Sequence, residues 1–491
     1  MKNYNKVLLI GLDGAPLELI EEFKDELPVI KSLMNGVYGK LDSVIPPLTP
    51  VAWTSMVTGV NPGKHNIFDF FKNEDYEKQI ATNDDIKAKA IWDYLNEKNL
   101  RTVLINVAYT YPIKPVNGFV IAGTPGNTAF GDFTYPESLK QTLLEEVPGY
   151  KIGVDWQNIN NDDDAFIKDL REVTTNQTKA GLMLLKENWD FFMIVFEDLD
   201  RIFHFHWRFM DKNHPLHNLN KKETEKYKDS IKDYMKFLDK RIGELVEKVD
   251  KNTLIILASD HGFGPLIKQV KINNCLEKFG FLKRKRYENK KESGKFIHFM
   301  YRLGFYKFFK KLPNKIQNIF RKKVIASKEQ DEEVIDWDNT QAWLSSISNQ
   351  SIRLNIKSRE SKGIVDTSDI KKVKTEIISK LMGIKDNGKK VIKRIYRPEE
   401  LYFGEYIENA PDLLIEMEDG YAAQKGFSEN FFEDPREGRV FKSGDHIRGG
   451  FFAISGEGIK KRKTGASILD ITPTILKNFN IKKKLDGKSI I

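Results

Sequence analysis

Residues 7–14 read VLLIGLDG, a short apolar run that ends in an acidic residue and a glycine. Such an uninterrupted run is typical of a strand that is buried on both faces of a parallel sheet. Asp13 ends the run too early for a signal peptide, so we interpret the run as the first buried strand. No apolar stretch approaches the roughly 20 residues needed to cross a bilayer.

The same kind of run recurs along the chain. The others are TVLINVAY at 102–109, FFMIVFED at 191–198, TLIILASDHG at 253–262 and GGFFAISG at 449–456. Helical patterns lie between them, notably at 85–98 and 223–251. This alternation predicts an α/β fold with a large, mostly parallel central sheet and helices on both faces. Three of the five runs end in Asp or Asp-His, at the sheet edge where ligands gather.

Residues 281–330 depart from this alternation of strand and helix patterns. They contain 16 Lys or Arg and three Glu. They account for more than the whole net charge of +9. We expect Pro313 to divide the segment into two amphipathic helices. A solvated hairpin and a surface for an anionic membrane both fit the pattern. The segment has no recognised nucleic-acid-binding fold, so we do not expect nucleic acid as a partner.

We therefore divide the chain into a first part of the core, a basic helical insertion, and a second part of the core that completes the site. These are residues 1–280, 281–330 and 331–491. The single cysteine, Cys275, excludes an intramolecular disulfide and fits a reducing compartment. We expect a cytoplasmic location, with peripheral membrane contact through the insertion as the alternative.

Several polar residues stand where a metal site needs them. Asp13 follows the first strand, and Asp260 and His261 end another, where burial is costly unless they are paired or bound to a metal. In FEDLDRIFHFHW, at 196–207, Asp200 and His204 are four apart and can meet one ion on a helical turn. Asp198 and His206 flank this pair as alternative ligands.

Two further elements are a threonine and a histidine in loops. Thr49 lies in PPLTPVAWTSMVTG, at 46–59, just before a helix expected at about 52–58. It is either a helix cap or a nucleophile at a helix N-terminus, where N–H groups favour phosphate. His446 lies in a glycine-containing loop beside Asp445 and Arg448, and is either an exposed residue or a ligand.

In their order and context, these five elements resemble the type I phosphodiesterase and nucleotide pyrophosphatase family of the alkaline phosphatase superfamily. The sequence is most similar to its prokaryotic branch of predicted phosphohydrolases and phosphomutases. The resemblance implies an alkaline phosphatase-like fold and a centre of two divalent ions, with Zn²⁺ as the first candidate and Mn²⁺ as the second.

The resemblance also implies roles for individual residues. Asp200, His204 and His446 would hold one ion, and Asp13, Asp260 and His261 the other, beside Thr49. It implies in-line attack by Thr49 on the phosphorus of a phosphate-ester substrate, a phosphothreonine intermediate, and hydrolysis by metal-bound hydroxide. Backbone N–H groups of Val51 and Ala52, or the side chains of Asn106 and Arg448, are the candidate phosphate contacts.

The predicted function is thus a metal-dependent phosphodiesterase. A phosphomonoesterase or phosphomutase on the same site is the alternative within the enzymes. A membrane or nucleic-acid binding protein on a hydrolase scaffold is the alternative outside them. The complete set of polar residues favours the enzyme, because a scaffold has no physical need for every ligand.

Overall fold

The computed structural model describes residues 4–124, 131–154, 162–285, 335–346, 350–428, 430–435 and 442–491. Beyond residue 285, the expected basic insertion lies outside the described residues. Within the described ranges, none of the helices combines the length and hydrophobicity needed to cross a bilayer.

A 10-stranded sheet forms the main body, in the order β22-β2-β21-β9-β1-β8-β5-β6-β7, with β23 paired to β2. The short strands β22, β23 and β7 span Arg462–Lys463, Ala466–Ser467 and Thr134–Tyr135. The central strands β9, β1, β8, β5 and β6 are parallel. They span Thr253–Ala258, Lys6–Leu12, Phe191–Phe196, Thr102–Val107 and Gly118–Ala122. The fold is therefore the expected α/β fold with a mostly parallel sheet.

The run at 449–456 departs from the parallel pattern. It forms β21, Gly449–Ser455, which is antiparallel to both β9 and β2, Val37–Asp42. The reason lies in the strands next to it: β10, Gly262–Pro265, closely follows β9 and pairs antiparallel with β20, Gly444–Ile447. Only Arg448 separates β20 from β21, so β21 continues the same antiparallel direction along β9.

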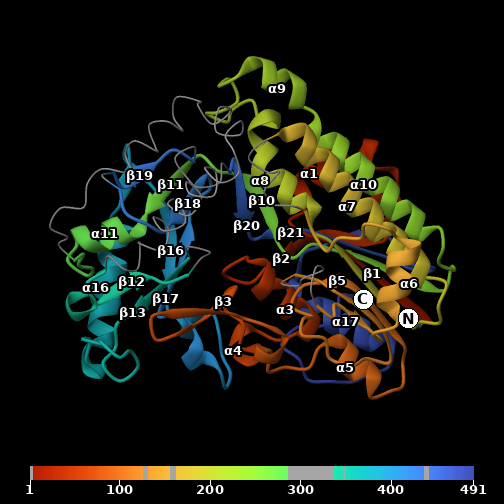
Figure 1. Ribbon diagram of the computed structural model, residues 1–491, viewed down its shortest axis with the longest axis horizontal. Helices are drawn as coiled ribbons and strands as arrows, with labels where there is room; N and C mark the ends of the chain where they lie inside the picture. Colours follow the sequence, from red (N-terminus) through yellow and green to blue (C-terminus); the bar gives the residue numbers. More distant parts are fainter. Residues whose placement is uncertain are drawn as a thin grey trace, which may run out of the picture.

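Successive residues of β1 point to opposite faces of the sheet, and both faces are covered (Figure 1). Leu8 and Ile10 pack with one group of helices, and Val7 and Leu9 pack with another. The first group includes α1, Leu17–Phe23; α2, Pro28–Leu33; α7, Asp163–Leu184; α8, Asp198–Met210; and α10, Ser230–Val246. The second includes α3, Thr49–Thr58; α5, Ile91–Asn96; and α17, Ile471–Asn478.

Helix boundaries differ from those expected from the sequence. The pattern at 85–98 gives only α5, and the pattern at 223–251 gives α10 together with α9, Lys221–Tyr227. The helix expected at 52–58 begins earlier, so that Thr49 is its first residue rather than a residue before it. Leu48, in extended conformation, precedes the helix without a side-chain cap.

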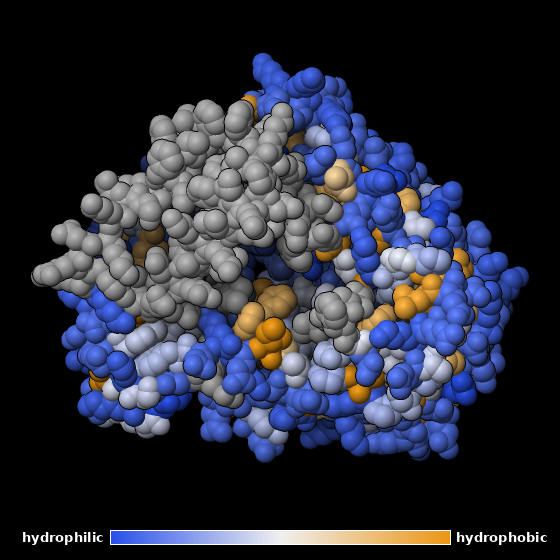
Figure 2. Space-filling view, in the orientation of Figure 1, coloured by the Kyte–Doolittle hydropathy of each residue, from blue (hydrophilic) through white to orange (hydrophobic). Residues whose placement is uncertain are grey.

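A second lobe with its own apolar core lies beside the main sheet (Figure 1). It contains a four-stranded sheet, β12-β13-β17-β16, and a three-stranded sheet, β18-β11-β19. These strands span Ala342–Leu344, Ser351–Leu354, Leu413–Met417, Ile392–Tyr396, Tyr421–Gln424, Lys268–Lys271 and Phe432–Glu433. Helices α11, Ile272–Lys278, and α16, Ile370–Met382, pack against them. Figure 2 shows the molecule hollowed near its centre, between the two lobes.

Candidate active site

The candidate site lies at the carboxyl ends of three adjacent strands. Asp13 directly follows β1, and Asp260 and His261 follow β9. Strand β8 leads through Glu197 into α8, which carries Asp200 in its first turn. Because these strands are parallel neighbours in the order β9-β1-β8, their carboxyl ends bring the polar side chains together at one edge.

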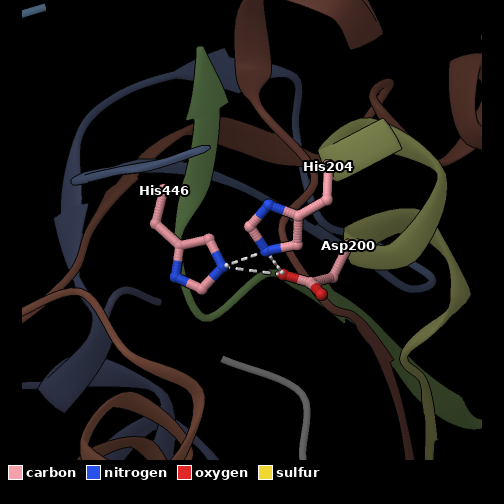
Figure 3. A group of neighbouring side chains, drawn as sticks. All are labelled: Asp200, His204 and His446. Carbon is pink, nitrogen blue, oxygen red and sulfur yellow. Dashed lines mark hydrogen bonds and ion pairs between the residues drawn. The ribbon is translucent and has the colours of Figure 1, made fainter. Parts of the chain in front are cut away.

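The first group of side chains is Asp200, His204 and His446 (Figure 3). Asp200 and His204 come from adjacent turns of α8, and His446 comes from β20. His446 Nε2 lies 2.8 Å from Asp200 Oδ1 and 3.1 Å from His204 Nε2. His204 Nε2 lies 3.5 Å from Asp200 Oδ1. Three potential ligand atoms thus converge on one point.

The second group expected from the sequence is Asp13, Asp260 and His261. Ligand atoms of Asp13, Asp200 and His261 lie within 4.8 Å of one another, so Asp200 of the first group also lies close to the second. His261 Nε2 lies 3.5 Å from Asp13 Oδ1 and 3.4 Å from Asp260 Oδ2. Within the part of the chain that the structure describes, these three atoms are buried and have no hydrogen-bond partner. Leaving buried polar atoms unpaired is costly, and three of them facing one another is the arrangement that a cation would satisfy.

The imidazole rings of the three histidines in the two groups are oriented by the same kind of contact. In each, Nδ1 faces a backbone carbonyl: Gly444 for His204, Pro47 for His446 and Gly262 for His261, at 2.8, 3.1 and 3.2 Å. Since a carbonyl only accepts, Nδ1 is assigned as the N–H donor. Each Nε2 lone pair is then directed into the groups of ligand atoms. Metal-binding histidines are commonly held by such a second hydrogen bond.

The electrostatics of the site also fit a bound cation. Burial, together with the charges of Asp260 and Asp200, raises the pKa of Asp13 well above its usual value. Burial likewise raises the pKa of Asp260, and the charge of Asp200 adds to the effect. Burial lowers the pKa of His261, which favours the neutral imidazole that binds metals. A divalent ion would stabilise all three carboxylates in their charged form.

A second layer of hydrogen bonds fixes the carboxylates. Asp13 Oδ2 accepts from the Trp53 indole N–H at 3.0 Å, and Asp260 Oδ1 accepts from Gly14 N–H at 3.2 Å. Arg201 donates to Asp200 Oδ2 at 2.8 Å and lies 3.3 Å from Glu197. In each aspartate, one oxygen is therefore held by the protein and the other is directed toward a histidine Nε2.

Thr49 lies at the N-terminus of α3 and lines the same cavity as Asp200, His204 and His446. The loop before it is tied to the first group of ligands, because His446 Nδ1–H donates to the Pro47 carbonyl. Unpaired N–H groups and the helix dipole at such an end favour an anion. The Thr49 hydroxyl thus lies at a helix end that favours an anion.

The cavity has a volume of about 770 Å³ and lies between the two lobes. Residues from the loop at 45–49, from α8, and from β20 with Arg448 line one side. Residues of the second lobe, among them Lys393, Glu416 and Tyr421, line the other. Both lobes therefore contribute side chains to the cavity.

The candidate phosphate contacts have different surroundings. Arg448 lines the cavity. The Ala52 N–H is bonded within the helix to the Leu48 carbonyl at 2.8 Å, so it is not available to a phosphate. Asn106 is fully buried, and its side-chain oxygen accepts from the Tyr150 hydroxyl at 2.7 Å.

The two alternative ligands from the sequence, Asp198 and His206, lie outside both groups of ligand atoms. Asp198 accepts a hydrogen bond from the Thr174 hydroxyl in the middle of α7, and His206 Nδ1 lies 2.9 Å from the Ser230 hydroxyl. Sequence reasoning did not identify Trp53, Arg201 or Lys442, which surround the ligand atoms. Trp53 and Lys442 are distant in sequence from the residues they contact, so no local pattern reveals them.

Comparisons with known proteins agree with this geometry. The family model for type I phosphodiesterases and nucleotide pyrophosphatases matches residues 7–446, which includes every residue of both groups. Human ectonucleotide pyrophosphatase/phosphodiesterase 5 is similar in structure, with a TM-score of 0.51 and 13% identity. The alignment covers 99% of this chain and 97% of that chain, and at this identity it shows the fold alone. No curated protein sequence matches the chain.

Proposed function

Because the chain belongs to the type I phosphodiesterase/nucleotide pyrophosphatase family and is thus a phosphoric ester hydrolase, we propose that it is a phosphodiesterase with Thr49 as its nucleophile. The observation that carries the proposal is that the buried atoms Asp13 Oδ1 and Asp260 Oδ2 both lie within 3.5 Å of His261 Nε2, and that none of the three has a hydrogen-bond partner among the described residues. Family membership supports the enzyme over the non-enzymatic scaffold.

Members of this family depend on metal ions, typically two divalent ions. We assign Asp200, His204 and His446 to one ion, and Asp13, Asp260 and His261 to the other. When bound, such ions lower the pKa of a hydroxyl or water and stabilise charge on oxygen. The mixed nitrogen and oxygen donors suit Zn²⁺ best, with Mn²⁺ second.

The chain's own residues position the reaction. The N-terminus of α3 binds the phosphate and presents Thr49 Oγ1 to the phosphorus. The Thr49 oxygen forms a bond to phosphorus, its proton is released, and the bond to the leaving alcohol breaks. Water then cleaves the phosphothreonine and restores the hydroxyl. The hydrogen bonds from Trp53 to Asp13 and from Arg201 to Asp200 keep the ligands in place through both steps.

The test is hydrolysis of bis-p-nitrophenyl phosphate and p-nitrophenyl phosphate by metal-stripped protein, with Zn²⁺ or Mn²⁺ restored. We expect Thr49→Ala to lower kcat by about three orders of magnitude or more. Thr54→Ala is the matched control, because Thr54 is buried on the same helix and does not line the cavity. Acid-quenched protein should carry phosphate on Thr49. Equal turnover by Thr49→Ala and wild type would refute the assignment.

The location of the protein and its membrane contact remain our predictions. We propose a cytoplasmic protein, and the alternative is that residues 281–330, with their 16 Lys or Arg, attach it to an anionic membrane surface. Sedimentation with anionic liposomes, with and without this segment, tests the attachment. Equal binding by the deletion variant would end the idea.

A further inference from the structure

Lys442 lies beside the ligand atoms. Its ammonium nitrogen is 3.2 Å from His204 Nε2, and it lines the cavity together with Thr49, Asp200 and His446. Because an ammonium group only donates, His204 Nε2 must be the acceptor in this contact. This agrees with the Nδ1–H of His204 donating to the Gly444 carbonyl. The positive charge therefore lies one hydrogen-bond length from a candidate metal ligand.

The backbone next to Lys442 is firmly anchored. Ser443 N–H donates to the His204 carbonyl at 2.6 Å, and the Ser443 carbonyl accepts from Leu266 N–H at 2.8 Å. At Gly444, an added Cβ would lie 2.5 Å from the Phe203 carbonyl oxygen, so only glycine permits this close packing against α8. The half-buried Lys442 is thus held at the site by its neighbours, unlike a lysine on a free surface.

Lys442 also differs in charge pairing from the other lysines of the cavity. Lys393 lies 3.0 Å from Glu416, and Lys40 lies 3.9 Å from Asp42. Among the described residues, no carboxylate oxygen lies within 4.0 Å of the Lys442 ammonium. A half-buried ammonium with only a neutral partner gains most from an anion that enters the cavity.

We propose that Lys442 contacts a non-esterified phosphoryl oxygen and thereby gives the site a second activity, the hydrolysis of phosphomonoesters. This inference rests on the proposed function, in which Thr49 attacks a phosphate in this cavity. A monoester carries a second negative charge that a diester lacks, so an additional cation favours the monoester more than the diester. Lys442 would act as a catalytic residue through direct contact with the substrate.

The test compares kcat/KM for p-nitrophenyl phosphate with kcat/KM for bis-p-nitrophenyl phosphate at pH 8, in wild type and Lys442→Met. We expect the ratio of monoester to diester to fall roughly 10- to 100-fold, as for the loss of a hydrogen bond to a charged group. Lys442→Arg should retain most of the ratio. Lys151→Met is the control, because Lys151 is paired with Asp169 at 3.0 Å and does not line the cavity.

A binding measurement separates substrate contact from a structural role. Inhibition of diester hydrolysis by inorganic phosphate should weaken roughly tenfold or more in Lys442→Met and little in Lys442→Arg. An unchanged ratio and an unchanged inhibition constant in Lys442→Met would overturn the inference while the proposed function stands. If wild type hydrolyses neither ester with either ion, the proposed function fails and the inference fails with it.

Discussion

The indole N–H of Trp53 donates to Asp13 Oδ2 at 3.0 Å, and this bond connects the helix that carries Thr49 to the end of strand β1. Trp53 is fully buried beneath the candidate site. The bond fixes the carboxylate so that Oδ1 lies 3.5 Å from His261 Nε2. A single side chain thus aligns the proposed nucleophile with one of the two groups of ligands.

We predict that Trp53→Phe weakens the binding of Zn²⁺ or Mn²⁺ by about 10- to 100-fold, as is typical when a partner of a metal ligand is removed. The phenyl ring keeps most of the buried volume, so the loss arises from the missing N–H. Calorimetric titration of metal-stripped protein measures the affinity. Trp92→Phe, on α5, should leave the affinity unchanged. Identical affinities in wild type and Trp53→Phe would contradict the positioning role.

The space that Trp53 occupies depends on a glycine in β1. A Cβ at Gly11 would lie 2.5 Å from Trp53 Cη2 and 2.9 Å from Val195 Cγ2. We expect Gly11→Ala to lower the free energy of unfolding by about 1–3 kcal/mol through overpacking. Urea denaturation of the metal-free protein measures this loss. Gly153→Ala, where nothing lies within 4 Å of the new Cβ, should be close to neutral.

Removal of the ions should destabilise the fold, because Asp13, Asp200 and Asp260 would then face one another in a buried site. Ligand at 100 times its Kd contributes about 2.7 kcal/mol, so we expect a chelator to lower Tm on the order of 5 °C. Differential scanning calorimetry with and without restored Zn²⁺ is the measurement. Asp445→Asn, in the cavity but in neither group, should keep the full shift. A Tm insensitive to chelation would argue against bound ions.

The stability of the metal-free protein should depend on pH through Asp198. Burial raises the pKa of Asp198 from 3.8 to about 7. A raised pKa means that the folded state binds the proton more tightly. The stabilising contribution is therefore complete below about pH 4 and is lost as the pH rises to about 7.

Asp198→Asn removes this titration. Relative to the variant, wild type should lose up to roughly 4 kcal/mol of unfolding free energy between pH 4 and pH 8, since each pKa unit is worth about 1.4 kcal/mol. Urea denaturation at both pH values tests this. Parallel pH profiles for the two proteins would show that Asp198 has no such shift.

Much of the fold is predictable from the sequence, because buried parallel strands give uninterrupted apolar runs such as residues 7–12. The direction of a single strand is not, since a strand that is buried on both faces gives the same apolar run whether its neighbours are parallel or antiparallel. The reversal of β21 therefore became visible only in the pairing with β9. The break between α9 and α10 was equally hidden, because the charged pattern continues through Lys228 and Asp229.

The candidate site, like the fold, is only partly predictable from the sequence. From spacing alone, both the pair Asp200 and His204 and the flanking pair Asp198 and His206 were candidate metal ligands. The two pairs differ only in the face of the helix that they occupy. The structure turns Asp198 toward Thr174 and brings Asp200 to His446. Contacts such as Trp53 with Asp13 depend on packing between distant elements, and no periodicity in the sequence records them.

The proposed ligands are spread along the chain from Asp13 to His446, and this spread sets an order of events during synthesis. The ribosome delivers Asp13, Asp260 and His261 long before His446, so a nascent chain can gather one group while the other is incomplete. Strand β21, which lies between β9 and β2, is delivered later still. Both groups of proposed ligands, and the pairing of β2 with β9 through β21, can be complete only after translation has passed residue 455.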